Sequence, residues 1–74
     1  MTIVKQLGMR IAYLRKQKGW TQEELAFQAN IHKNYLCDLE NGKRNPTLKI
    51  LSSIANALDI SLSFLFKGLQ SFDE

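Results

Sequence analysis

The sequence predicts an all-α fold, a single bundle of five helices spanning residues 1–74. Three observations lead to this fold class. Hydrophobic residues recur at steps of three and four in successive segments, which is the period of one helix face. Residues that cap or end helices separate these segments, and no stretch shows the alternation typical of a strand. The length also suits one small domain rather than two.

The first helix is expected to end before Gly19, a residue that favours a helix C-terminus. Its apolar face is formed by Val4, Leu7, Ile11 and Leu14. Gly8 lies inside this segment, where glycine costs about 1 kcal/mol relative to alanine. We therefore expect another part of the chain to pack closely against Gly8.

A second, short helix is predicted after Thr21, whose hydroxyl can form a capping box with Glu24. Trp20 before the cap and Leu25 inside the helix fit a hydrophobic staple. The helix is expected to end near Asn30, because asparagine tolerates the left-handed backbone of a tight turn.

The third helix is predicted over residues 33–40, with His32 at the capping position. Leu36 and Leu39 form its inward face, and Ile31 fills the turn before it. Two short helices joined by a tight turn over about residues 22–40 indicate a helix-turn-helix, which lays its second helix in the DNA major groove.

Two further helices follow the turn residues of segment 41–46. Thr47 can cap a fourth helix over residues 48–58. Ser61 can cap a fifth, short helix from Leu62 to about Lys67, closed by Gly68.

Composition excludes several classes of function. One cysteine, Cys37, cannot form an internal disulfide, and one Cys with one His cannot supply the four ligands of a structural zinc site. The dispersed acids offer no catalytic pair, so we expect no enzyme, cofactor or small-molecule ligand. Without a membrane span or signal pattern, the expected location is the cytoplasm.

Charge is distributed unevenly along the chain. Residues 1–46 hold eight Lys/Arg and four Asp/Glu, a net of +4, whereas residues 47–74 hold two and three, a net of −1. A basic part followed by an apolar part favours a polyanion as one partner and a protein as the other.

The outward face of the third helix follows from its period of 3.6 residues per turn. Since the leucines point inward, the outward set is Lys33, Asn34, Cys37 and Asp38. Lys33 can donate to guanine, Asn34 can bond adenine, and Asp38 can accept from cytosine N4. Asp38 would repel phosphates, so it faces the groove floor or orients Lys33 or Asn34; the alternative is that all four residues form a solvated surface.

Tyr35 and Glu40 are neighbours of this face, and each has its own interpretation. Tyr35 lies at the boundary, where its ring packs or its hydroxyl reaches a phosphate. Glu40 falls on the inward face, where an unpaired carboxylate is costly, and its candidate partner is Arg15.

Thr21-Gln22-Glu23-Glu24-Leu25-Ala26 and Leu39-Glu40-Asn41-Gly42-Lys43-Arg44-Asn45-Pro46-Thr47 resemble motifs of the phage Cro/CI-repressor-like helix-turn-helix family. The resemblance covers about residues 7–65, and the size is similar to that of short controller proteins of restriction–modification systems.

The resemblance implies roles for individual positions. It places base-facing residues at Lys33, Asn34, Cys37 and Asp38, and phosphate contacts at Gln22, Asn41, Lys43 and Arg44. It also implies an ion pair between Arg15 and Glu40. Asn30 replaces the usual turn glycine, and His32 replaces the usual Ser or Thr cap; a protonated His32 would contact a phosphate instead.

The leading interpretation is a homodimeric transcription regulator that binds double-stranded DNA at a near-palindromic operator. The candidate dimer interface is Phe64, Leu65, Phe66 and Leu69, some of which must instead fill the core. The alternative function is a small antitoxin or anti-repressor that acts mainly through protein contacts.

Overall fold

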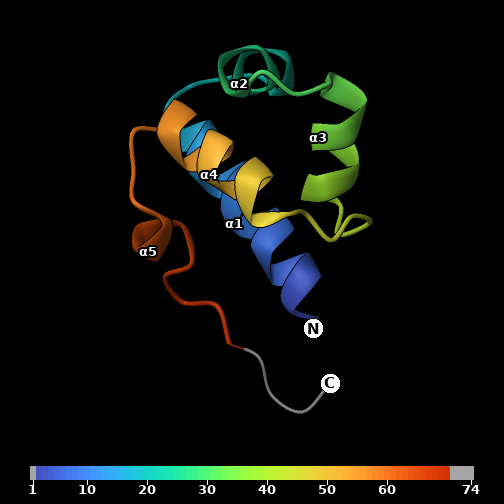
Figure 1. Ribbon diagram of the computed structural model, residues 1–74, viewed down its shortest axis with the longest axis vertical. Coiled ribbons are helices and arrows are strands. Elements are labelled where there is room, and N and C mark those ends of the chain that lie inside the picture. Colours follow the sequence, from blue (N-terminus) through green and yellow to red (C-terminus); the bar gives the residue numbers. More distant parts are fainter. Residues whose placement is uncertain (1, 71–74) are drawn as a thin grey trace.

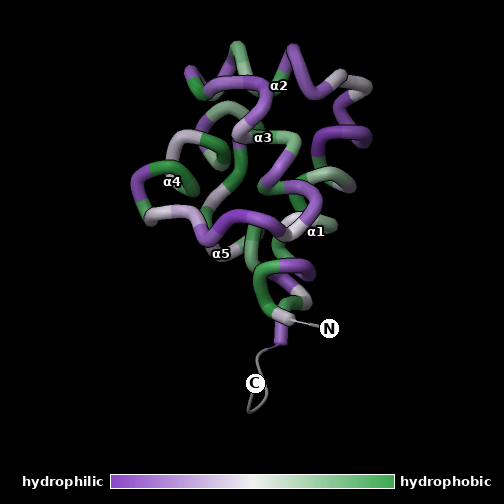
Figure 2. The backbone as a smooth tube through the Cα atoms, turned by 90° about the vertical axis from the view of Figure 1, so that its right-hand side faces the viewer, coloured by the Kyte–Doolittle hydropathy of each residue, from purple (hydrophilic) through white to green (hydrophobic). Residues whose placement is uncertain are grey.

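The computed structural model describes residues 2–70 and contains the five predicted helices (Figure 1). They are α1 (Ile3–Gln17), α2 (Gln22–Ala29), α3 (Lys33–Glu40), α4 (Leu48–Ala57) and α5 (Leu62–Leu65). α1 and α4 form the centre, while α3 and α5 lie on opposite sides of the view in Figure 1. Figure 2 shows hydrophobic and hydrophilic stretches alternating along the helices, as amphipathic helices require.

Each helix begins at a side chain that accepts a hydrogen bond from the backbone of its first turn. These capping residues are Thr2, Thr21, His32, Thr47 and Ser61. The capping box of α2 is half formed: Thr21 Oγ1 accepts from the Glu24 amide at 3.1 Å. The Glu24 carboxylate, however, accepts from Gln28 Nε2 at 2.8 Å, one turn further along the helix.

A left-handed residue follows or ends every helix. These residues are Gly19, Asn30, Gly42, Asp59 and Gly68. Asn30, with φ 56°, confirms the predicted turn, whereas Asp59, with φ 59°, was not foreseen. At both, the chain reverses so that the next apolar residue, Ile31 or Ile60, packs against the core.

The core is formed by side chains from all five helices. Its fully buried large side chains are Ile11, Leu25, Leu36, Leu39, Ile54 and Leu65. A Cβ built on Gly8 would lie 2.4 Å from the Leu39 carbonyl oxygen and 2.6 Å from that of Glu40. The predicted close packing at Gly8 is therefore confirmed, and it is the C-terminal end of α3 that approaches α1.

The C-terminal part differs from the prediction. α5 ends at Leu65 rather than near Lys67, and α4 ends at Ala57 rather than Leu58. Arg10 of α1 donates from Nη2 to the Phe64 carbonyl at 2.8 Å and from Nε to the Leu65 carbonyl at 3.3 Å. The guanidinium thus binds carbonyls at the end of α5.

Leu65 is fully buried and belongs to the core. Its assignment to the dimer interface is wrong, because a side chain that is 0% exposed within one chain presents no surface to a second. Phe64 and Phe66 remain 44% and 37% exposed, and Leu69 is partly buried.

A side-chain amide ties the end of the described chain to α1. Gln6 Nε2 donates to the Gln70 carbonyl at 2.9 Å, and its Oε1 accepts from the Gln70 amide at 3.1 Å. This two-bond contact holds the segment after α5 alongside the first turns of α1.

Candidate nucleic-acid interface

α3 separates its side chains as its sequence predicts. Leu36, Leu39 and Glu40 are buried, whereas Lys33 and Asn34 are exposed. Cys37 and Asp38 are partly exposed, on the same outward side of the helix. The predicted candidate reading face is therefore a real surface of the protein.

A buried ion pair fixes α3 against α1. Arg15 Nε lies 2.7 Å from Glu40 Oε2, and Arg15 Nη2 lies 3.0 Å from Glu40 Oε1. The two side chains are only 10% and 5% exposed. Arg15 Nη1 also donates to the Trp20 carbonyl at 2.8 Å, which engages the turn before α2. The pair predicted between Arg15 and Glu40 is confirmed.

Gln22 joins the same network from the first turn of α2. Its Nε2 donates to Glu40 Oε1 at 2.9 Å, so the Glu40 carboxylate accepts from α1 and α2 together. A side-chain amide has two N–H groups, which leaves one for another acceptor. The phosphate contact of Gln22 stays a prediction, but the structure adds a positioning role that sequence reasoning missed.

His32 caps α3 through its ring. Nδ1 accepts from the Asn34 amide at 3.1 Å, so this nitrogen carries no hydrogen in the capped state. The tautomer assigned from this bond carries its hydrogen on Nε2. The exposed His32 can therefore cap the helix through Nδ1 and still offer its Nε2–H to a phosphate.

Asp38 has a different partner from those the sequence suggested. Its Oδ2 lies 3.6 Å from Arg44 Nε, and the Arg44 guanidinium lies 5.1 Å from the centroid of the Tyr35 ring. Of the two alternatives predicted for Asp38, the one in which it orients Lys33 or Asn34 is therefore not observed. Tyr35 is partly buried against the core, and the Arg44 guanidinium packs over the face of its ring.

Backbone geometry explains why these residues meet. Gly42 adopts a left-handed conformation, and the Lys43 amide donates to the Asp38 carbonyl at 2.9 Å. This bond folds the chain back over the end of α3, as helix C-terminal motifs do. The predicted turn at Asn41-Gly42 is therefore the one that returns Arg44 to Asp38.

The remaining predicted phosphate-binding residues flank this fold-back. Asn41 Nδ2 donates to Cys37 Sγ at 3.7 Å across one helical turn. Lys43 and Lys33 are exposed, and within residues 2–70 the ion pairs are Arg15–Glu40 and Asp38–Arg44. Both lysine ammonium groups are thus available to an anion from outside.

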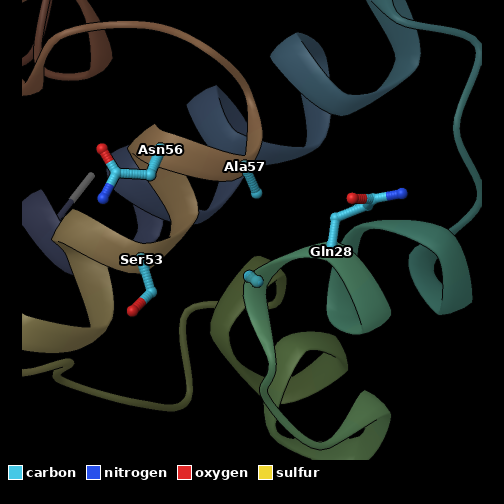
Figure 3. A pocket seen from close by; sticks show the side chains of 5 residues that line it. Gln28, Ser53, Asn56 and Ala57 are labelled. Carbon is cyan, nitrogen blue, oxygen red and sulfur yellow. The ribbon is translucent and has the colours of Figure 1, made fainter.

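A hollow between α2 and α4 has fewer features that indicate a function. This hollow of about 350 Å³ is lined by Gln28, Ala29, Ser53, Asn56 and Ala57. Figure 3 shows Gln28 of α2 on one side of it and Ser53, Asn56 and Ala57 of α4 on the other. It is lined by no charged residue and by no predicted site residue. Among the described residues there is no group of three potential metal ligands and no helix long and apolar enough to cross a membrane.

Comparison with known proteins identifies the family. Residues 11–65 match the profile of the family described as Helix-turn-helix, so the chain belongs to this family. It is 42% identical over 57 residues to the immunity repressor protein of Bacillus phage phi105, covering 77% of this chain and 40% of that protein. The resemblance to phage repressors is therefore confirmed.

Solved structures agree with this identification. The restriction–modification controller protein C.AhdI of Aeromonas hydrophila is 41% identical, with a TM-score of 0.81 over 86% of this chain and 96% of that one. The controller protein C.Esp1396I, solved as a tetramer in complex with its natural 35-base-pair operator, is 32% identical. Its TM-score is 0.85, over 93% of this chain and 91% of that one.

Proposed function

We propose that this protein is a transcription regulator that binds double-stranded DNA sequence-specifically, as a homodimer on a near-palindromic operator. The observation that carries the proposal is the buried network of Arg15, Gln22 and Glu40. It joins α1, α2 and α3 and leaves Lys33 and Asn34 exposed on the outside of α3. Such a rigid, polar helix face is what direct reading of base edges requires.

The proposed contacts fall into two groups. Lys33, Asn34, Cys37 and Asp38 lie on the outward face of α3 and would meet base edges in the major groove. Phosphates would be bound from either side of that face, by Gln22, His32, Tyr35, Asn41, Lys43 and Arg44. No catalytic step is part of this function, and it places the protein with its DNA in the cytoplasm.

The proposed dimer interface is the apolar surface formed by Phe64, Phe66 and Leu69 together with Ile3. Phe66 and Leu69 line one shallow apolar hollow with Ile3 and Leu7. Two copies related by a two-fold axis would place their α3 helices about 34 Å apart, one turn of B-DNA. Replacing Phe66 by Ser should shift the wild-type dimer towards monomer in analytical ultracentrifugation.

Control of restriction–modification genes is the finer proposal. It is supported by the similarity to C.AhdI over 96% of that chain. Genes for a methyltransferase and an endonuclease beside the gene for this protein would support it, whereas a neighbouring toxin gene would favour an antitoxin.

The direct test of DNA binding is selection from a pool of randomised duplexes, followed by binding titrations at several salt concentrations. We expect selected sites with two-fold symmetry. If the dimer makes ~6–10 phosphate contacts, affinity should fall by ~10³–10⁵ between about 50 and 200 mM salt. Failure to enrich any sequence, or an affinity independent of salt, would contradict the proposed function.

A further inference from the structure

The outward side of α3 and the loop after it carry one carboxylate among three cations. Lys33, Lys43 and Arg44 are exposed and positive, and Asp38 stands between them in sequence and is partly exposed. A DNA-binding surface gains affinity from its cations and loses it through a carboxylate, because the phosphate backbone is a polyanion. The presence of Asp38 on this face therefore needs a reason other than affinity.

The contacts of Asp38 are weak enough to be exchanged. Its Oδ2 is 3.6 Å from Arg44 Nε, and the Arg44 and Asp38 side chains are 51% and 41% exposed. Solvated ion pairs of this kind contribute little to stability, and a phosphate can compete for the guanidinium. The Arg44 guanidinium also lies 5.1 Å from the centroid of the Tyr35 ring, a contact that does not depend on the carboxylate.

We propose that Asp38 is a specificity-determining residue that weakens binding to non-cognate DNA, by holding Arg44 and by placing a carboxylate in the groove. On a non-cognate sequence the carboxylate would lose hydration without gaining a donor, which is costly. On a cognate sequence an exposed base amino group, cytosine N4 or adenine N6, donates to it. Arg44 is then released to a phosphate. The proposal rests on the proposed function and adds the cause of discrimination.

The variant Asp38→Asn removes the charge while keeping the shape. It should bind random-sequence DNA more tightly than wild type, and its salt dependence there should steepen by about 0.9 for each Arg44 that gains a phosphate. On the selected site the amide oxygen of asparagine can still accept from the base amino group, but it is a weaker acceptor than the carboxylate. The ratio of the two affinities should therefore fall by about 5- to 150-fold.

The experiment uses two duplexes, one that the wild-type protein selects from a randomised pool and one with the same bases in shuffled order. Asp59→Asn is the charge-matched control, since Asp59 is exposed after α4, in a left-handed conformation that asparagine tolerates. Asp38→Asn should reduce discrimination, and Asp59→Asn should leave it within twofold. In an Arg44→Ala background, Asp38→Asn should no longer change the salt slope but should still reduce discrimination.

Three results would overturn the inference. An unchanged ratio of affinities in Asp38→Asn, with a thermal melt like that of wild type, would show that the carboxylate does not discriminate. An equal effect of Asp59→Asn would assign the change to net charge alone. If the wild-type protein itself does not distinguish the two duplexes, the proposed function fails together with the inference.

Discussion

Two arginines of α1 hold two different parts of this molecule. Arg15 meets the Glu40 carboxylate inside the protein, where the two side chains are 10% and 5% exposed. Arg10 instead binds two backbone carbonyls at the end of α5 and lies 5.0 Å from the centroid of the Phe64 ring. The first contact is buried and matched in charge, whereas the second lies nearer the surface and involves no acid.

The difference shows how one small domain combines a rigid part with an adaptable one. Around α3, as elsewhere among residues 2–70, every buried side-chain polar atom has a partner, and the buried Arg15–Glu40 pair joins α3 to α1. α5 has only four residues, and carbonyls at its end accept hydrogen bonds from Arg10. Phe64 in this helix and Phe66 just after it remain exposed. Such a surface is suited to completion by a second chain.

The largest predicted effect is at the rigid junction. Replacing either Arg15 or Glu40 by Met should lower the free energy of unfolding by ~3–5 kcal/mol, because the remaining charge stays buried without its partner. The double variant should lose much less than the sum of the single variants. Thermal and urea unfolding of all three proteins measures this, and small, strictly additive losses would contradict the coupling.

A second test of the same junction is Gly8→Ala. The added methyl group would overlap the carbonyl oxygens of Leu39 and Glu40, which belong to helical backbone and cannot move independently. We expect a net loss of ~1–3 kcal/mol of stability despite the better helix propensity of alanine. An increase in stability would mean that α1 and α3 do not approach as closely as described.

A smaller effect is expected at the adaptable junction. Arg10→Met should cost ~1–2 kcal/mol, because its hydrogen bonds to backbone carbonyls are only partly shielded from water. It should also weaken dimerisation by loosening the helix that carries Phe64. Lys16→Met removes the same charge from an exposed position of α1 and is the matched control. Equal effects of the two variants in ultracentrifugation would contradict the role given to Arg10.

Sequence reasoning succeeded where local chemistry decides the structure. The spacing of apolar residues and the caps at Thr21, Thr47 and Ser61 placed the helices, and the inward position of Glu40 pointed to Arg15. It could not determine which acceptors Arg10 would meet, because backbone carbonyls leave no mark in the sequence.

The length of α5 and the fate of Leu65 were missed for a related reason. The predicted fifth helix ends in residues 64–67, of which Phe64, Leu65 and Phe66 are apolar. Which of these residues enter the core and which stay on the surface depends on how α5 is oriented against α1. The pairing of Asp38 with Arg44 likewise depends on the fold-back after Gly42. Each of these features is tertiary, and helical periodicity alone does not determine it.

The central claim is that the outward face of α3 reads bases, and Asn34→Ala tests it most directly. Selection from randomised duplexes should show that this variant loses preference at one base position in each half-site, with ~1–3 kcal/mol lost on the wild-type site. Arg44→Ala, the comparison variant, should weaken binding without changing which base is preferred at any position. If Asn34→Ala keeps the wild-type preference at every position, the reading face has been assigned wrongly.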